Sequence, residues 1–461
     1  MRSLRRLLLL FSKEWRELTV SRAYWLLLLA VGPLVGHGFI NAVNLYAEAS
    51  GVGGGPAALP QGLTPLDGIL APTFGAYDLA VTLLFPFVAI RLIAAEKESG
   101  ALKLGLQLPF GAGEMVAAKL SALVAGWLIA WLPGLIAVTM WKAYGGHLYA
   151  PETLNLALGH WLRMLLSAAV AIAAAALAES AASAAIVTLG FTIGTWALDF
   201  IAGGRGGWLA AVAAYTPAAA LRFFERGLLR LSVVIVMSVM ALGGLTIAAI
   251  WLHTGRKLDA RLLRTAALLG LIAVALWLGS LSRASWDASE NRRNSFSRAD
   301  EAALRRIREP MRITINLAAE DPRLMDYERG VLNKLRRILP RLEVDYAAQS
   351  RTGLFEGAEE RYGEIWYELG GRKVMNRSTT EPINKGVRKF VKKGVENMPL
   401  ELNKWHEIKI AVHGTQLEGW LNGKHLLDYT LAEPVSGKIG LWSKTDSVSY
   451  FDEFTVTPAS K

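Results

Sequence analysis

Seven runs of mostly apolar residues, each about 20 residues long, constrain the fold of this chain more than any other feature. Lipid cannot hydrogen-bond to free backbone groups, so a run of this length predicts a membrane-spanning helix. All seven runs precede Ser282, and most of the charged residues follow it. We therefore expect a membrane half joined to a soluble half. The predicted spans are 24–43, 76–95, 116–140, 161–178, 181–201, 231–252 and 265–281.

The fourth and fifth runs are separated by two residues, Glu179 and Ser180. Both runs are rich in alanine, so one long bent helix is the alternative to two spans. Together they are too long to cross the bilayer once. The sequence therefore favours two helices joined by a tight hairpin.

The distribution of basic residues predicts the orientation of the spans. Several Lys or Arg residues lie before the first run, after the second and before the seventh, whereas residues 44–75 contain none. Cytoplasmic loops carry such an excess of basic residues. Seven spans then place the N-terminus in the cytoplasm and everything after Arg283 outside. Segment 203–230 is basic although this scheme puts it outside, and its half-apolar stretches predict a re-entrant element.

The first 22 residues have the pattern of an amphipathic helix. Leu4, Leu7, Phe11, Trp15 and Leu18 recur at helical spacing, and arginines occupy the other side. Such a helix can lie in the cytoplasmic membrane interface. The alternative is an ordinary basic flank that sets the topology.

The loop after the second run has a pattern of its own. Segment 96–109 reads EKESGALKLGLQLP, and it resembles the first cytoplasmic loop of ABC-2 type transporter permeases. Glu96, Gly100, Leu102 and Pro109 match the family pattern, whereas Ala101 and Lys103 stand where Thr and Glu are usual.

This resemblance implies a short coupling helix that docks on a separate ATP-binding subunit; a plain solvated loop is the alternative. The sequence contains no G-x-x-x-x-G-K-[ST] phosphate-binding loop, so we expect no ATP hydrolysis, and no cofactor, in this chain. ATP and Mg would lie on the partner subunit. The residues expected to couple to that subunit are Glu96, Glu98, Gly100, Leu102 and Pro109.

The first part of the soluble half predicts an α/β unit. Residues 285–309 are charged and predict a linker helix. Strand 311–317, a helix that begins at Asp321-Pro322 and strand 342–347 form a β-α-β pattern, and 365–375 predicts a hairpin. Segment 286–382 resembles the periplasmic auxiliary component of gliding-motility-type ABC transporters. Glu320, Asp321 and Arg323 form either a polar site or, for Asp321, a helix cap.

The last part predicts strands only. Asn422-Gly423 is typical of a type I′ hairpin, and segment 402–458 resembles the last strands of a laminin-G/concanavalin-like jelly roll. Such domains often bind glycans. The aromatic residues either stack on a sugar or pack in a core. They are Trp405, Trp420 and Trp442.

Cysteine is absent from the sequence, and His406, His413 and His425 have no supporting frame of ligands, so we expect no metal site and no catalytic residue. The net charge of +11 mostly flanks apolar runs, which favours a lipid bilayer over nucleic acid as the partner.

These observations predict an α-helical polytopic membrane domain, a small α/β unit and a C-terminal antiparallel β domain. We expect a permease subunit of an ATP-driven ABC-2 type transporter in a bacterial inner membrane. Its partners would be an ATP-binding subunit and a second or sister permease copy. The alternative is a membrane-anchored glycan-binding or scaffold protein. The predicted divisions are 1–22 (interfacial helix), 23–283 (permease), 284–382 (auxiliary-like) and 383–461 (β-rich).

Overall fold

A computed structural model shows two compact units, residues 1–294 and 295–461, which we describe one at a time. The first unit reaches past the expected boundary at residue 283. The structure describes residues 2–49, 64–202, 212–213, 215–253, 255–282, 284–290, 292–296, 298–318, 321–339, 341–346, 362–377, 404–430, 452–453 and 455–457.

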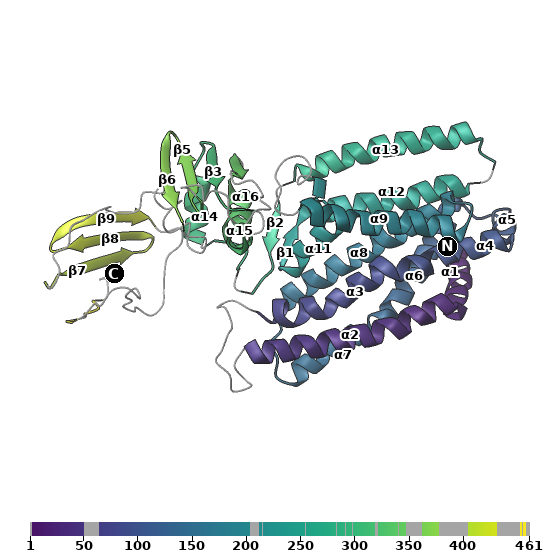
Figure 1. Cartoon of the computed structure of the whole chain (residues 1–461), viewed down its shortest axis with the longest axis horizontal. Helices are drawn as coiled ribbons and strands as arrows, with labels where there is room; N and C mark the ends of the chain where they lie inside the picture. The colour runs from purple at the N-terminus through teal and green to yellow at the C-terminus, as the bar shows by residue number, and fades with distance from the viewer. Residues whose placement is uncertain are drawn as a thin grey trace. The chain divides into compact units, whose positions relative to one another are not determined.

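The first unit is a bundle of helices (Figure 1). Seven helical segments among the described residues are long and apolar enough to cross a membrane. Each contains one predicted run, apart from the last residue of the fourth run and of the seventh. The fourth ends at Leu177 and the fifth begins at Ala181, which confirms the tight hairpin. The seven are α2 (Arg22–Ala49), η1 with α3 and α4 (Leu66–Leu70, Ala71–Leu83, Phe85–Glu98), α6 with α7 (Ala112–Ala130, Leu132–Ala143), α8 (Ala150–Leu177), α9 (Ala181–Ala202), α12 (Leu231–Leu252) and α13 (Leu258–Ser280).

The second and third spans are each interrupted once, just before a proline. Pro86 follows the junction of α3 and α4, and Pro133 follows the junction of α6 and α7. Proline has no backbone N–H, so a helix that contains it loses a hydrogen bond. At the second junction the Tyr77 hydroxyl donates to the Ala130 carbonyl (3.1 Å) and accepts from the Gly134 amide (2.9 Å). A buried side chain from α3 therefore satisfies backbone groups beside the break.

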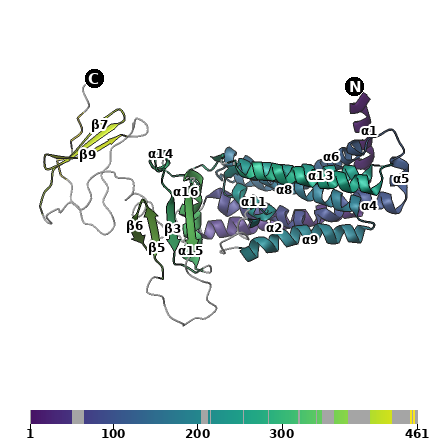
Figure 2. The ribbon, with the colours of Figure 1, turned by 90° about the horizontal axis from the view of Figure 1, so that it is seen from above.

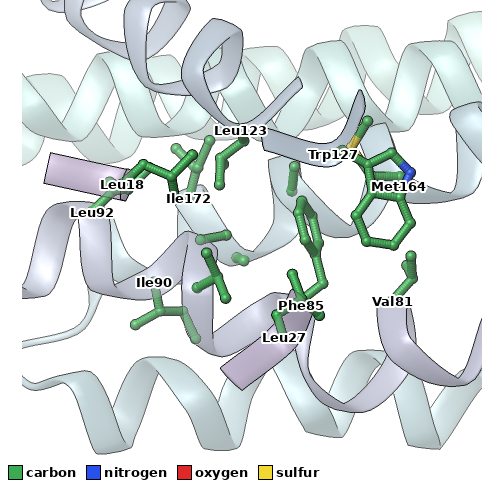
Figure 3. Close-up of a cluster of buried hydrophobic side chains, with 14 of the residues drawn as sticks. Leu18, Leu27, Val81, Phe85, Ile90, Leu92, Leu123, Trp127, Met164 and Ile172 are labelled. Carbon is green, nitrogen blue, oxygen red and sulfur yellow. The ribbon is translucent and has the colours of Figure 1, made fainter. Parts of the chain in front are cut away.

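The core of the bundle is built from apolar side chains of most of its helices. Figure 3 shows Leu18 of α1 and Leu27 of α2 with residues of α3, α4, α6 and α8. Phe85 and Trp127 meet edge to face, with ring centroids 5.0 Å apart. By contrast, Gly279 is the one buried residue of α13, so that helix directs most of its apolar side chains outward, as lipid contact requires.

The chain segments between the spans gather at two opposite ends of the bundle. At one end, α1 (Arg2–Val20) lies across the helices, near α5 (Ala101–Gly105) (Figures 1 and 2). At the other end lie α11 (Pro217–Glu225) and a ribbon of β1 (Leu228–Arg230) paired with β2 (Ser285–Asp287). The N-terminal helix and the segment that follows α13 are therefore at opposite ends, as an odd number of spans predicts.

The prediction of one linker helix over 285–309 is wrong. Ser285–Asp287 is strand β2, and helix α14 covers only Arg298–Arg305. Residues between them hydrogen-bond to the bundle: Arg293 pairs with Asp67, and the Asn294 amide donates to the Arg226 carbonyl (2.7 Å). These contacts hold the segment against the bundle, so it does not form a free helix, and some of its charged residues form ion pairs. We call residues 284–294 the clasp.

The second unit contains the predicted β-α-β pattern. Strand β3 (Met311–Ile315) pairs in parallel with β4 (Leu342–Tyr346), and helices α15 (Pro322–Tyr327), η2 (Glu328–Leu332) and α16 (Asn333–Ile338) connect them. The predicted hairpin is β5 (Ile365–Leu369) and β6 (Arg372–Asn376), and the sheet order is β4-β3-β5-β6. Its core contains Tyr327 and Tyr367, whose hydroxyls lie 2.6 Å apart.

A separate three-stranded meander consists of β7 (Ile408–His413), β8 (Gln416–Leu421) and β9 (Lys424–Thr430). Asn422 and Gly423 both have positive φ angles, 49° and 78°, which confirms the turn predicted there. The strand expected over 438–442 and most of the one over 448–456 lie outside the described residues.

Candidate functional site

The loop between α4 and α6 is a tightly built turn at the same end of the bundle as α1. Gly100 has φ +75°, a left-handed conformation that glycine adopts without strain, and it ends α4. Leu102 is the buried residue of α5, and the Gly111 amide donates to the Glu114 carboxylate (2.9 Å) at the start of α6. The sequence motif therefore forms a turn, a short helix with one buried apolar residue, and a capped N-terminus at the start of α6.

Glu96 lies inside the protein, in a cluster of charged side chains from three helices. The Lys119 ammonium of α6 lies 2.8 Å from a carboxylate oxygen of Glu96 and 2.8 Å from one of Glu14 in α1. Lys119 also donates to the Leu92 carbonyl (2.7 Å) and is fully buried. Lys13 of α1 pairs with Glu96 and lies 3.1 Å from Glu14. The buried ammonium therefore donates hydrogen bonds to Glu14 and to the Leu92 carbonyl, and it lies at ion-pair distance from Glu96.

The protonation of α1 follows from this packing. Burial raises the pKa of Glu14, against the lowering effect of Lys119. Burial lowers the pKa of Lys13, but the hydrogen bond to Glu96 and the charges of Glu14 and Glu96 outweigh it, so the pKa of Lys13 is raised overall. Glu14, Glu17 and Glu96 are grouped closely enough to hold a metal ion. Two lysine ammonium groups already lie among them, so the cluster neutralises most of its own charge.

Lys97, the next residue, contacts a different helix. Its ammonium donates to the carbonyls of Ala175, Ala176 and Ala178, at 2.6, 2.9 and 2.8 Å. These carbonyls are at the C-terminus of α8, where a helix leaves its last acceptors unpaired and favours a positive charge. The α4 end is thus tied to the α8–α9 turn.

The outward face of the loop is partly apolar. Leu104 is 68% exposed and Leu108 is 53% exposed, and Glu98, Lys103 and Pro109 are exposed around them. Exposed apolar side chains on a rigid turn suit contact with another protein. Of the predicted coupling residues, Glu98 and Pro109 lie on this face, Glu96 and Leu102 are buried, and Gly100 shapes the turn.

A second group of charged residues lies within the bundle, nearer its other end. Arg163 of α8 is buried; its Nε lies 2.9 Å from Asp78 of α3, and it donates to the Thr82 hydroxyl (3.1 Å). Arg222 of α11 makes two contacts to the Asp199 carboxylate of α9. Charged residues inside a membrane bundle are costly, and they often mark a pathway.

Near this group, the carboxyl of Glu225 in α11 is half-buried. Burial and the charge of Asp78 raise the pKa of Glu225 to about 7, against the lowering effect of Arg222 and Arg226. It is the titratable group here that changes charge near neutral pH.

Sequence reasoning missed Asp78 and Arg163. They fall close to the ends of the predicted runs 76–95 and 161–178, where a charged residue is unremarkable. The structure extends the helices, and residues 85 positions apart become partners. The sequence feature that could have indicated this ion pair is one acidic residue near the start of the second span and one basic residue near the start of the fourth, which is the same end of the bundle.

The structure describes some of the other predicted site residues in the soluble half. Asp321 accepts from the Arg323 amide (2.9 Å) and from its guanidinium, so it caps α15. Trp420 lies against the His425 ring, and the Lys409 ammonium lies over it, 5.2 Å from the centroid. Trp405 is 72% exposed. Glu320 and Trp442 lie outside the described residues.

Comparison with known families gives one match. Residues 8–204 match the model of a family described as ABC-2 family transporter protein. The matched segment, less than half of the chain, contains most of α1, the loop with Glu96 and the first five spans. Comparison with curated proteins and with solved structures found no significant match. Residues 8–204 are thus similar to ABC-2 family transporter proteins, and the seven candidate spans support a multi-pass membrane protein.

Proposed function

We propose that the chain is the permease subunit of an ATP-driven transporter and that the loop from Glu98 to Pro109 docks on a separate ATP-binding subunit. The observation that carries the proposal is the loop itself. Its outer face exposes Leu104 and Leu108, and its base is fixed by the buried ion contacts of Glu96. A partner that binds such a turn can move the helices below it.

In this proposal α1 lies in the cytoplasmic membrane interface. Its buried side, with Leu10, Glu14 and Leu18, faces the bundle, and Leu8 and Leu9 are exposed. Exposed leucines beside Arg5 and Arg6 suit an interface between acyl chains and anionic headgroups. The end with α1 and α5 would then be cytoplasmic, and the clasp at 284–294 would lie on the outer side.

Purification of the full-length chain from its native membrane, in lipid nanodiscs, tests the proposal. We expect an ATP-binding subunit to be recovered with it, together with vanadate-sensitive ATP hydrolysis. Recovery of the chain without such a subunit, from membranes in which other transporter complexes stay intact, would contradict the proposal.

The resemblances to a gliding-motility auxiliary component and to a laminin-G-like domain remain predictions. So does a second permease copy as partner. The contacts of Lys409 and His425 with Trp420 favour a packing role for that ring over sugar stacking. The described residues therefore offer no specific support for the glycan-binding alternative.

A further inference from the structure

Two consecutive residues at the end of α4 hold different parts of the bundle. Successive side chains on a helix point about 100° apart, so Glu96 and Lys97 diverge. Glu96 contacts Lys119 of α6 and Lys13 of α1. The Lys97 ammonium donates to the last carbonyls of α8, beside the turn to α9.

We propose that Glu96 and Lys97 are positioning residues that pass movement of the coupling loop to two groups of helices. Glu96 links the loop to α1 and α6, and Lys97 links it to the α8–α9 turn. The inference rests on the proposed function, because the movement comes from the ATP-binding subunit. It assigns a separate transmission route to each residue.

The contacts of Glu96 and Lys97 are strong enough to pass movement of the loop to the helices that they touch. Breaking a buried ion pair from one side leaves an uncompensated buried charge, which destabilises a protein far more than the loss of an exposed pair. Lys119 is fully buried, donates to Glu14 and to the Leu92 carbonyl, and lies 2.8 Å from a carboxylate oxygen of Glu96. These contacts join α1, α4 and α6, so we expect the three helices to stay together when the loop moves. Lys97 is half-buried and donates to three carbonyls, and hydrogen bonds from a charged donor are about twice as strong as neutral ones.

The absence of cysteine helps a distance measurement, because introduced cysteines are the only sites in this chain that take a thiol-specific spin label. Ser12, Ala101 and Glu179 are exposed on α1, the loop and the α8–α9 turn. The two label pairs are Ala101→Cys with Ser12→Cys, and Ala101→Cys with Glu179→Cys. Each is measured in the co-purified complex, first without nucleotide and then trapped with ATP and vanadate.

In the otherwise unchanged chain we expect both distances to stay the same on trapping. Glu96→Gln should let the loop–α1 distance shift and leave the loop–turn distance alone. This variant is mild, because Lys119 keeps Glu14 and the Leu92 carbonyl. Lys97→Met should have the opposite pattern, and Lys97→Arg should restore the original behaviour. Lys142→Met, at an exposed lysine of α7, is the matched control and should shift neither distance.

The outcomes separate this inference from the proposed function. If no ATP-binding subunit co-purifies with the unchanged chain, the proposed function fails. If the subunit co-purifies but either distance changes on trapping in the unchanged chain, the inference is overturned. It is also overturned if the two variants affect both distances alike, or neither.

Discussion

The buried charges of this bundle are held in place by opposite charges from other helices. Lys119 lies between Glu14 and Glu96, and Arg163 lies beside Asp78. A charge taken out of water is costly unless it is paired and its hydrogen-bonding groups are satisfied. The partners come from different helices, so these pairs fix helix against helix at particular positions.

The raised pKa of the Glu225 carboxyl predicts how the stability of the bundle depends on pH. A pKa raised to about 7 means that the folded state favours the neutral carboxyl. The stability this gives is fully present below the ordinary pKa of 4.5 and is lost as pH rises through about 7. We therefore expect Glu225→Gln to reduce the fall in unfolding temperature between about pH 5 and pH 8.

The groups that face Glu225 are Asp78, Arg222 and Arg226, and all three stay in place in this variant. Glu179→Gln, in the exposed α8–α9 turn, is the control and should keep the full pH dependence. An unchanged pH dependence in Glu225→Gln would show that another group titrates.

At the scale of elements, the broken third span depends on one hydroxyl. The Tyr77 side chain serves a carbonyl of α6 and an amide of α7 on the two sides of Trp131. Gly134 also has no room for a side chain, because an added Cβ would lie 2.8 Å from the Tyr77 oxygen. The close approach of α3 to this break is therefore part of the fold.

Tyr77→Phe should lower the stability of the bundle by about 1–3 kcal/mol, because two buried backbone groups lose their partner. Thermal unfolding in detergent would measure it. Tyr144→Phe, at a tyrosine 80% exposed beside α7, is the control and should be neutral. Equal effects of the two substitutions would contradict the role assigned to Tyr77.

Apolar runs and turn residues predicted most elements correctly. The seven spans, the hairpin at Glu179 and the Asn422-Gly423 turn depend on local patterns, which the sequence shows directly. Strand β2 could not be predicted in this way. Its partner β1 is separated from it in the sequence by two spans, α12 and α13. In addition, a charged segment such as 285–309 has no apolar alternation to indicate a strand.

At the scale of the molecule, the site at the α1 end is assembled from distant parts of the sequence. The motif from Glu96 to Pro109 predicted where the loop would be. It did not predict that Lys119 would bind Glu14, 105 positions away, because side-chain partners depend on which helices pack together. The inward position of Glu96 follows from that packing.

The clasp at the other end makes a prediction about truncation. A chain ending at Asn294 keeps the β1–β2 ribbon and the Arg293–Asp67 pair, and its helical unit should unfold like that of the full chain. A chain ending at Ser282 loses both, together with the other hydrogen bonds of this segment, and should be less stable by several kcal/mol, given roughly 1 kcal/mol for each net hydrogen bond. Equal unfolding temperatures for the two truncations would contradict this account of the clasp.

The central claim is that the loop after the second span binds a separate ATP-binding subunit. A photo-crosslinking side chain at Leu104, in the full-length chain in its native membrane, tests it most directly. The matched position is Leu135, which is exposed on α7, within a membrane-spanning segment. The account predicts a crosslink to an ATP-binding protein from Leu104 and none from Leu135. Crosslinks from Leu104 to lipid alone, or to the same proteins as from Leu135, would contradict it.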